Sequence, residues 1–268
     1  MITVTSFDEQ YRDIVFRAIA DGERVMDRTG VGTRKLFGQE MRFDLSKEFP
    51  APTLKKLFFE SAKKEMFWIY QDQSNDVGLL RDKYGVKVWD EWEQEDGTIG
   101  NAYGFIVQKH NQIDKLIEGL KTNPHGRRHI ISLWDIEELP NMALNPCAFQ
   151  TIWNVERGRL NCHLVQRSGD LGLGVPFNSA QYAVLVHMVA HCVDLQPGEL
   201  WHTIVDAHIY ENHVEPLKEM LFRPIMREVN PQLVNLAHTE QDFYKLKPEH
   251  FQLVGYDSHP HIRLEVAV

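Results

Sequence analysis

The sequence contains little cysteine and no long apolar run, and both deficits exclude classes of protein. Its 268 residues include three cysteines, Cys147, Cys162 and Cys192, an odd and sparse set that does not suit a disulfide framework. No stretch of about 18 apolar residues occurs, so we expect no membrane-spanning segment and no membrane partner. The first residues lack a basic segment followed by an apolar block, so we expect no signal peptide. These absences together favour the reducing cytoplasm.

The chain also lacks an excess of positive charge. Lysine and arginine number 29 against 38 aspartates and glutamates, which gives a net charge of −9. That balance disfavours a general nucleic-acid-binding surface, although it leaves room for a local basic pocket. The residues are 43% hydrophobic and 25% charged, and no low-complexity run occurs, so a mainly disordered chain is excluded.

Helix-like and strand-like segments interleave without the regular spacing of β-α-β units. Apolar spacing predicts helices near residues 7–23, 56–71, 113–124, 178–195 and 212–222, and we expect Pro197 and Gly198 to end the fourth. Alternating patterns predict a strand after the glycines of 27–45, two strands around an Arg-Gly turn in 147–168, and another at 199–210. With no linker and no repeat, the sequence predicts an α+β fold in one domain, residues 1–268.

Cys147 stands in the sequence Asn-Pro-Cys at the start of a strand-like run. An arbitrary cysteine is most often a small buried apolar residue. A reactive thiolate needs positive charge nearby to lower the pKa of the thiol, and arginines elsewhere in the chain offer it. Cys162 and Cys192 lie inside apolar periodic segments, so we interpret both as buried structural residues.

Four arginines stand in loops or at strand edges, namely Arg28, Arg127, Arg128 and Arg167. Any one of them would ordinarily be a solvated surface residue. Together, in an acidic chain, they suggest a focused anion site, because planar guanidinium groups suit phosphate. Ser168, beside Arg167, could add a hydroxyl donor to such a site.

Two polar residues each allow two interpretations. Asn178 directly precedes the strongest predicted helix, so it could be an N-cap, or its amide could read the edge of a pyrimidine. Glu65 is followed by Met66, Phe67 and Trp68. It is a surface residue by default, but in an apolar pocket its pKa would rise and it could shuttle protons.

The histidines do not assemble a convincing metal site. His187 and His191 share a helix face, but the sequence between them lacks the glutamate of the zinc-protease motif. His208 and His213 follow Asp206 without a third ligand at suitable spacing. We therefore expect no metal.

The order of these segments resembles that of the folate-dependent thymidylate synthases. The matching runs are DRTGVGT, KEMFW, VWDEW, GRRHI, MALNPC, QRSGDLGLGVPFN, DAHIYENH and a terminal VAV, from about Arg28 to Val268. The resemblance implies a mixed β-sheet covered by helices, with two copies joined through the sheet as a homodimer. It further implies a methyltransferase that converts dUMP to dTMP with 5,10-methylenetetrahydrofolate as donor of one carbon and a hydride.

The resemblance assigns a nucleotide site residue by residue. Cys147 corresponds to the nucleophile that adds to carbon 6 of uracil, with Asp206 nearby. Asn178 corresponds to the amide that reads the uracil edge, and His208 and Tyr210 to the pair that holds the deoxyribose 3′-hydroxyl. The implied phosphate site consists of Arg28, Arg167, Ser168 and, from the partner subunit, the residues equivalent to Arg127 and Arg128.

The resemblance also assigns a folate site and a proton-transfer network. Glu65 and Tyr103 correspond to residues that manage protons, and Asp170 to the contact with the pterin ring. The residues implied in the apolar wall and in closure over folate are Trp89, Trp92, Leu144, Lys55 and the carboxylate of Val268.

Four features depart from the common family pattern. Ala148 follows the nucleophile where histidine is usual, and the run CAFQTIWNV is similar to a less common bacterial branch. Ile204 and Val205 precede Asp206 where small residues are usual, and the loop after Tyr103 is shorter. These departures concern fine substrate contacts more than the reaction.

Two other functions stay open at this point. A related hydroxymethyltransferase would let water instead of hydride capture the one-carbon unit; its cytidylate version would carry aspartate in place of Asn178, whereas a uridylate version is compatible with this sequence. An inactive member retained for binding is disfavoured, because Cys147, Glu65 and the four arginines are all present.

Overall fold

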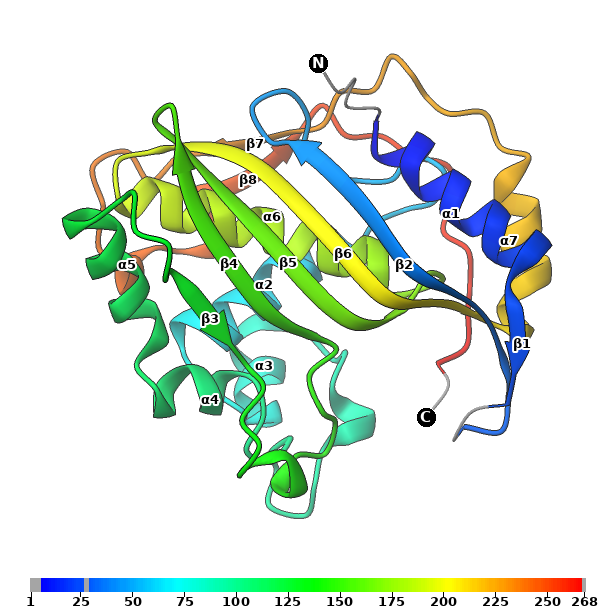
Figure 1. The fold of residues 1–268 in the computed structure, drawn as a ribbon, viewed down its shortest axis with the longest axis horizontal. Coiled ribbons are helices and arrows are strands. Elements are labelled where there is room, and N and C mark those ends of the chain that lie inside the picture. Colours follow the sequence, from blue (N-terminus) through cyan, green and yellow to red (C-terminus); the bar gives the residue numbers. More distant parts are fainter. Residues whose placement is uncertain (1–5, 27–28, 267–268) are drawn as a thin grey trace.

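The computed structural model describes residues 6–26 and 29–266, and it is built around one mixed six-stranded sheet (Figure 1). The strand order is β1-β2-β6-β5-β4-β3; β5 and β6 run parallel, and every other neighbouring pair is antiparallel. The strands of this sheet are β1 (Glu23–Val25), β2 (Thr33–Asp44), β3 (Ile130–Ser132), β4 (Ala148–Glu156), β5 (Arg159–Asp170) and β6 (Gln196–Tyr210). A separate hairpin pairs β7 (Gln232–Asn235) with β8 (Phe251–Val254).

Helices cover one face of the sheet and flank its edges. The α-helices are α1 (Phe7–Asp21), α2 (Phe59–Met66), α3 (Val77–Tyr84), α4 (Gly104–Lys109), α5 (Gln112–Thr122), α6 (Gly174–Cys192) and α7 (Val214–Leu221). Short helical turns are η1 (Phe67–Gln71), η2 (Asp90–Trp92), η3 (Leu139–Asn141), η4 (Glu211–His213), η5 (Phe243–Lys245) and η6 (Pro248–His250). The mixed sheet with helices is the α+β arrangement that the sequence predicted.

Helix α6 lies behind the sheet and forms the centre of the core (Figure 1). It packs against β5 and β6 on one side and against α2 on the other. A helix enclosed on two sides needs apolar residues around most of its circumference, which explains why this segment gave the strongest helix signal.

The predicted ends of α6 were wrong. The helix begins at Gly174, four residues before Asn178, and Pro176 is accommodated because the first turn needs no backbone hydrogen-bond donor. It ends at Cys192, and the chain turns at Asp194, which has a φ of 54°. Pro197 and Gly198 therefore belong to strand β6 and do not end the helix.

Other predicted elements are confirmed with local differences. The turn between β4 and β5 places Arg157 and Gly158 at φ values of 53° and 74°, the conformation that closes a tight hairpin. The helices expected at 7–23, 113–124 and 212–222 are α1, α5 and α7. The helix expected at 56–71 is α2 followed by the π-helical turn η1. Helices α3 and α4 and the β7–β8 hairpin were not predicted, because each is too short for a clear periodic pattern.

The face of the sheet opposite α6 has no helix across it in Figure 1. Aromatic side chains lie on this face: the His163 ring stacks on Trp201 at 4.1 Å, and the Arg42 guanidinium lies 4.2 Å from the same Trp201 ring. Near the edge of the sheet, Phe37 is 86% exposed. This surface carries aromatic rings among charged side chains, such as Glu40, which accepts a hydrogen bond from Trp201 Nε1 at 2.7 Å. None of the helices in the described part of the chain has the length and apolar character to cross a membrane.

Candidate active site

Cys147 lies directly before β4, half-buried, with its sulfur beside a guanidinium group. Arg167 Nη2 is 3.7 Å from Cys147 Sγ and donates a hydrogen bond to the Asn145 carbonyl at 2.7 Å. Arg167 Nε donates to the Pro146 carbonyl at 2.9 Å, and the backbone N–H of Arg167 donates to the Cys147 carbonyl at 2.9 Å. The arginine therefore holds the Asn-Pro-Cys segment in place and puts positive charge at the thiol, as a thiolate nucleophile requires.

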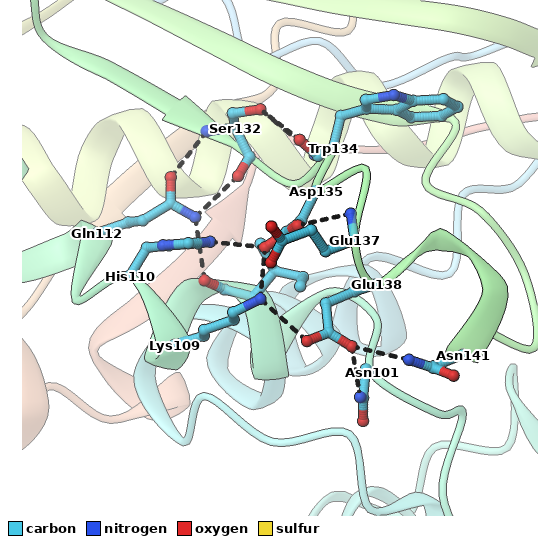
Figure 2. A network of polar contacts seen from close by, with 11 residues as sticks. Asn101, Lys109, His110, Gln112, Ser132, Trp134, Asp135, Glu137, Glu138 and Asn141 are labelled. Atoms are coloured by element: carbon cyan, nitrogen blue, oxygen red, sulfur yellow. Dashed lines mark hydrogen bonds and ion pairs between the residues drawn. The ribbon is translucent and has the colours of Figure 1, made fainter.

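The loop between β3 and β4, which ends at Cys147, is held by a polar network that the sequence did not reveal (Figure 2). Lys109 Nζ lies 2.9 Å from Asp135 Oδ2 and 2.9 Å from Glu138 Oε1, so one lysine on α4 joins two points of the loop. Trp134 on the same loop lies under the guanidinium of Arg167, 5.6 Å from the ring centre. The network thus positions an aromatic surface against the arginine that contacts Cys147.

The other two cysteines are in a different environment. Cys162 and Cys192 are buried, and burial raises the pKa of both thiols, that of Cys192 to about 12. None of the three cysteines is in a disulfide. The prediction that Cys162 and Cys192 are buried structural residues is confirmed.

Glu65 occupies an apolar pocket and is only 6% exposed. Burial raises the pKa of its carboxyl group to about 7, although hydrogen bonds from Trp89 and Gln181 act in the opposite direction. Trp89 Nε1 donates to Glu65 Oε1 at 2.9 Å. The surface interpretation is wrong, and a carboxyl group with this pKa can gain or lose a proton near neutral pH.

An aromatic cluster surrounds this carboxyl group. The Trp89 ring packs edge-on against Tyr103 at 5.1 Å and against Trp92 at 5.6 Å, and Leu144 packs half-buried against the core. Tyr103 has a φ of 48° and ψ of −103°, a rare conformation for a bulky residue. Burial raises the pKa of Tyr103 well above its usual value, and its side chain forms a hydrogen bond with the backbone of Cys147. The structure therefore joins the aromatic wall to the nucleophile through Tyr103.

Asn178 lies inside α6 and not at its N-cap, a position occupied by Leu173. The N-cap interpretation of Asn178 is therefore wrong. Its amide oxygen accepts a hydrogen bond from Gln166 Nε2 at 3.0 Å, and its amide nitrogen donates to Gln181 Oε1 at 2.9 Å. The side chain is half-buried, so one side of a firmly held amide is accessible.

The last part of β6 brings together the residues assigned to the sugar. Asp206 Oδ1 accepts from His208 Nδ1 at 2.9 Å, and the rings of His208 and Tyr210 meet edge-on at 5.4 Å. Burial works to lower the pKa of His208, but the hydrogen bonds to Asp206 and the negative charges of Asp170 and Asp206 together outweigh it, so the pKa is raised. The parallel pairing of β5 and β6 places Ser168 opposite Asp206 and Asp170 opposite His208.

Asp170 and Lys55 meet beside Gly172. Lys55 Nζ donates to the Gly172 carbonyl, and Asp170 Oδ1 accepts from the Gly172 N–H at 2.7 Å. Burial lowers the pKa of Lys55 to about 8. Burial also acts to raise the pKa of Asp170, but the interaction with His213, whose Nδ1 is 3.8 Å away, holds it below the usual value. Sequence reasoning had left His213 among the histidines without a role.

Arg127 and Arg128 line a separate hollow of the surface. Both are exposed and line a hollow of about 480 Å³ together with Asn123, His125, Gly126 and His129. No residue of the cluster around Cys147 lines that hollow. Arg28 and Val268, the two remaining predicted site residues, lie outside the described residues.

Within residues 6–26 and 29–266, no group of three or more histidine, cysteine, aspartate or glutamate side chains could hold a metal ion. The groups near the Cys147 thiol suit acid–base chemistry. They are the Glu65 carboxyl group, whose pKa is about 7, and the Tyr103 hydroxyl, which is hydrogen-bonded to the backbone of Cys147. The Asn178 amide is held by a hydrogen bond from Gln166.

Residues 9–268 match the family model described as thymidylate synthase. The chain belongs to the thymidylate synthase family. It is 48% identical over 269 residues to a thymidylate synthase of Clostridium beijerinckii, covering 98% of this chain and 99% of that one. It also superposes on the thermostable thymidylate synthase A of Bacillus subtilis with a TM-score of 0.90 and 39% identity, covering 98% of this chain and 100% of the other. The thymidylate synthase fold, the expected family and methyltransferase chemistry are thereby confirmed.

Two of the departures from the common thymidylate synthase pattern have a structural account. Ala148 is buried, and its carbonyl accepts a hydrogen bond from the Tyr182 hydroxyl at 3.3 Å. Ile204 is buried against Gly169, where an added Cβ would come within 2.7 Å of the Ile204 side chain. Ala148 and Ile204 therefore have a place in the packing, whereas Val205 is 43% exposed and has no structural explanation.

Proposed function

We propose that Cys147 is the nucleophile in the reductive methylation of dUMP to dTMP, the reaction of the thymidylate synthase family. Addition of a thiolate to carbon 6 of uracil turns the ring into an enolate, which is nucleophilic at carbon 5. The observation that carries this proposal is the guanidinium of Arg167, 3.7 Å from Cys147 Sγ. Its positive charge favours the thiolate, whereas burial raises the pKa of the Cys162 and Cys192 thiols and favours their neutral form.

Nucleotide recognition divides among three groups of residues. Arg28, Arg167 and Ser168 bind the phosphate, with Arg127 and Arg128 supplied by the partner subunit. His208 and Tyr210 bind the 3′-hydroxyl, and the raised pKa of His208 supports donation to an oxygen. Asn178 reads the uracil edge with one amide hydrogen and its oxygen, which match the carbonyl at position 4 and the N–H at position 3.

Proton transfer is assigned to Glu65, with Tyr103 and Asp206 as further members of the network. A pKa of about 7 lets Glu65 protonate the developing enolate oxygen and later accept a proton at working pH. Tyr103 is hydrogen-bonded to the backbone of Cys147, which supports a role next to the reacting carbon. Asp206 contacts His208 and acts on the sugar side of the site.

The residues assigned to 5,10-methylenetetrahydrofolate fit that molecule. Asp170 is an ionised acceptor for ring N–H groups, and Lys55 beside it is a buried donor. Trp89, Trp92 and Leu144 offer an apolar wall on which a flat ring can pack, and Val268 is assigned to closure. Bound there, the folate supplies the one-carbon unit and the hydride. The wall excludes water, which protects the final reduction step.

The whole chain is proposed to act as one catalytic domain in a cytoplasmic homodimer joined through the sheet. The helix-free face with the aromatic Trp201, and the exposed Phe37 near the edge of the sheet, support the sheet as the contact surface. Arg127 and Arg128 line a surface hollow that no residue of the cluster around Cys147 shares, which supports their use in the partner's site. One continuous core supports a single domain.

The identity of the products tests the function. With dUMP and the methylene folate, we expect dTMP and dihydrofolate, so ultraviolet absorbance rises as the folate is oxidised. Capture by water would instead leave the folate reduced and give a nucleotide one oxygen atom heavier than dTMP. Flat absorbance with that heavier product would make the protein a uridylate hydroxymethyltransferase.

The base-reading role of Asn178 has its own test. A site built for one hydrogen-bonding pattern rejects a base that leaves its polar groups unpaired. Asn178→Asp replaces the amide donor with a carboxyl oxygen. That oxygen can accept a hydrogen bond from the cytosine amine. We expect the ratio of dCMP to dUMP binding to rise by about tenfold or more. An unchanged ratio would leave Asn178 as a purely structural residue of α6.

A further inference from the structure

A chain of side-chain hydrogen bonds runs through the core from β6 to the carboxyl group of Glu65. It passes from His202 on β6 to Gln166 on β5, then to Asn178 and Gln181 on α6. Gln181 in turn hydrogen-bonds Glu65. His202 is fully buried, 0% exposed, and so far has no function assigned to it.

The donors in this chain can be assigned one after another. Gln166 Nε2 donates to the Ser168 carbonyl at 2.9 Å and to Asn178 Oδ1 at 3.0 Å, which uses both amide hydrogens. The Gln166 oxygen therefore faces His202 Nε2, 2.7 Å away, and an amide oxygen only accepts. His202 Nε2 must carry the hydrogen.

The other ring nitrogen of His202, Nδ1, must then be a hydrogen-bond acceptor. Burial lowers the pKa of His202 to about 3, so the ring is neutral and Nδ1 is an acceptor. Ser179 Oγ lies 3.0 Å from Nδ1 and 3.1 Å from the Val175 carbonyl. Because the neutral ring carries its hydrogen on Nε2, Nδ1 can only accept, so the 3.0 Å contact is a hydrogen bond when the serine hydroxyl donates to Nδ1 in place of the Val175 carbonyl.

All donors consequently point in one direction, from Ser179 towards Glu65. The Asn178 amide donates to Gln181 Oε1 at 2.9 Å, and the Gln181 amide nitrogen is left to donate to the carboxyl group. Reversing any amide in the chain would set two donors or two acceptors against each other, at a cost typical of unpaired buried polar groups.

We propose that His202 is a positioning residue. It keeps the donors of this row of hydrogen bonds pointing towards Glu65 and thereby fixes which atoms Asn178 presents to the pyrimidine. In the observed direction the Asn178 oxygen and one amide hydrogen match uracil. In the reversed direction they exchange places and match cytosine, and Gln181 turns its oxygen to Glu65, which must then be protonated. This inference rests on the proposed base-reading role of Asn178.

Equilibrium binding of dUMP and of dCMP to the full-length protein tests the proposal, with thermal unfolding measured alongside. His202→Leu removes the donor to Gln166, and we expect the ratio of dCMP to dUMP affinity to rise about tenfold, equivalent to ~1.4 kcal/mol. His202→Gln keeps an amide hydrogen for the Gln166 oxygen and should restore most of the parental ratio. Ser179→Ala leaves His202 free to change tautomer, and we expect a smaller rise in the same direction.

His187→Leu is the matched control. His187 is also a buried histidine, it lies on α6, and its Nε2 has no hydrogen-bond partner among the described residues. Its replacement should leave the ratio unchanged. An equal change in His187→Leu would mean that any loosening of the core alters the ratio, and it would overturn the proposal.

The remaining outcomes separate the two proposals. If Asn178→Asp shifts the ratio but His202→Leu and Ser179→Ala do not, His202 has no positioning role and the base-reading role of Asn178 stands. If Asn178→Asp itself has no effect, both fail. If His202→Leu does not fold, Ser179→Ala decides, and an unchanged ratio in that variant overturns the proposal.

Discussion

The two ends of the proposed nucleotide site are built in opposite ways. At the base end, Gln166, Asn178 and Gln181 form neutral hydrogen bonds with one another, and only one side of Asn178 is accessible. At the phosphate end, Arg127 and Arg128 are exposed, with no hydrogen bond or ion pair to another described residue. Selecting a neutral base requires dipoles that are fixed beforehand, whereas binding a phosphate relies on charge that the ligand itself neutralises.

Arg167 connects the two ends. Its guanidinium bonds the carbonyls of Asn145 and Pro146 and approaches the sulfur of Cys147, although the residue is also assigned to the phosphate. A phosphate bound to Arg167 would therefore lie on the same side chain that orients the nucleophile. If Arg167 binds the phosphate as proposed, nucleotide binding would be coupled to the position of the Cys147 sulfur.

The largest effect is expected at the buried end, from Glu65→Gln. The variant has no titratable carboxyl group, so kcat should fall by roughly 10²- to 10⁴-fold while dUMP binding changes little. The parent should show a limb in its pH–rate profile near pH 7, the pKa of Glu65, and the variant should lack it. A variant with parental kcat would assign proton transfer to another group.

The same substitution should stabilise the protein at high pH. Because the folded-state pKa of Glu65, about 7, lies above the ordinary glutamate value of 4.5, the parent loses stability as pH rises from about 4.5 through 7. Between pH 5 and pH 8.5, the free energy of unfolding of Glu65→Gln should gain roughly 2–3 kcal/mol on the parent, at ~1.4 kcal/mol per pKa unit. Urea unfolding at both pH values measures this, and parallel pH curves would contradict it.

Arg167→Leu should weaken both phosphate binding and the reactivity of Cys147. Loss of the guanidinium frees the Asn145 and Pro146 carbonyls and removes the charge beside Cys147, so kcat/KM for dUMP should fall by about 10²-fold. The rate at which an alkylating reagent modifies Cys147 should fall in the same variant. Arg167→Lys keeps the positive charge but lacks the paired donors of the guanidinium group. Its kcat/KM and its alkylation rate should lie between those of the parent and those of Arg167→Leu. Unchanged thiol reactivity in Arg167→Leu would separate the arginine from the nucleophile.

A smaller effect tests whether the exposed arginines serve the partner. Cys147→Ala and Arg128→Ala are mixed after each is shown to be inactive alone. Random exchange in a twofold dimer yields some sites free of both mutations, and about a quarter of parental activity should return. No recovery after demonstrated exchange would place Arg128 in the site of its own subunit.

The sequence singled out Cys147 and Arg167 more directly than the residues around them. Asn-Pro-Cys and the Gln-Arg-Ser run are contiguous patterns, so Cys147 and Arg167 could be identified before their contact was known. The choice between a surface role and a proton-transfer role for Glu65 could be made only once its burial was known. That burial depends on Trp89 and Gln181, which are distant in the sequence. Asn178 looked like an N-cap because the apolar periodicity begins after it, whereas the helix starts at Gly174. Strong periodicity therefore predicts that a helix exists more reliably than where it begins.

Residues that contact the site only through other residues have no recognisable pattern in the sequence. His202 is one of the 13 histidines in the chain, and only the parallel pairing of β5 and β6 beside α6 brings it to Gln166. Likewise, the contact of Lys109 with Asp135 and Glu138 depends on the packing of α4 against a loop that follows β3. Such contacts arise from the tertiary fold, and spacing along the chain does not encode them.

The covalent adduct at Cys147 tests the central claim most directly. 5-Fluoro-dUMP cannot lose fluorine from carbon 5 as a cation, so with the methylene folate the reaction should stop at a covalent complex. Intact mass should show the nucleotide and folate bound to the parent protein, and peptide mapping should locate them on Cys147. Cys147→Ala should form no complex. An adduct on Cys162 or Cys192, or one that persists in Cys147→Ala, would contradict the assignment.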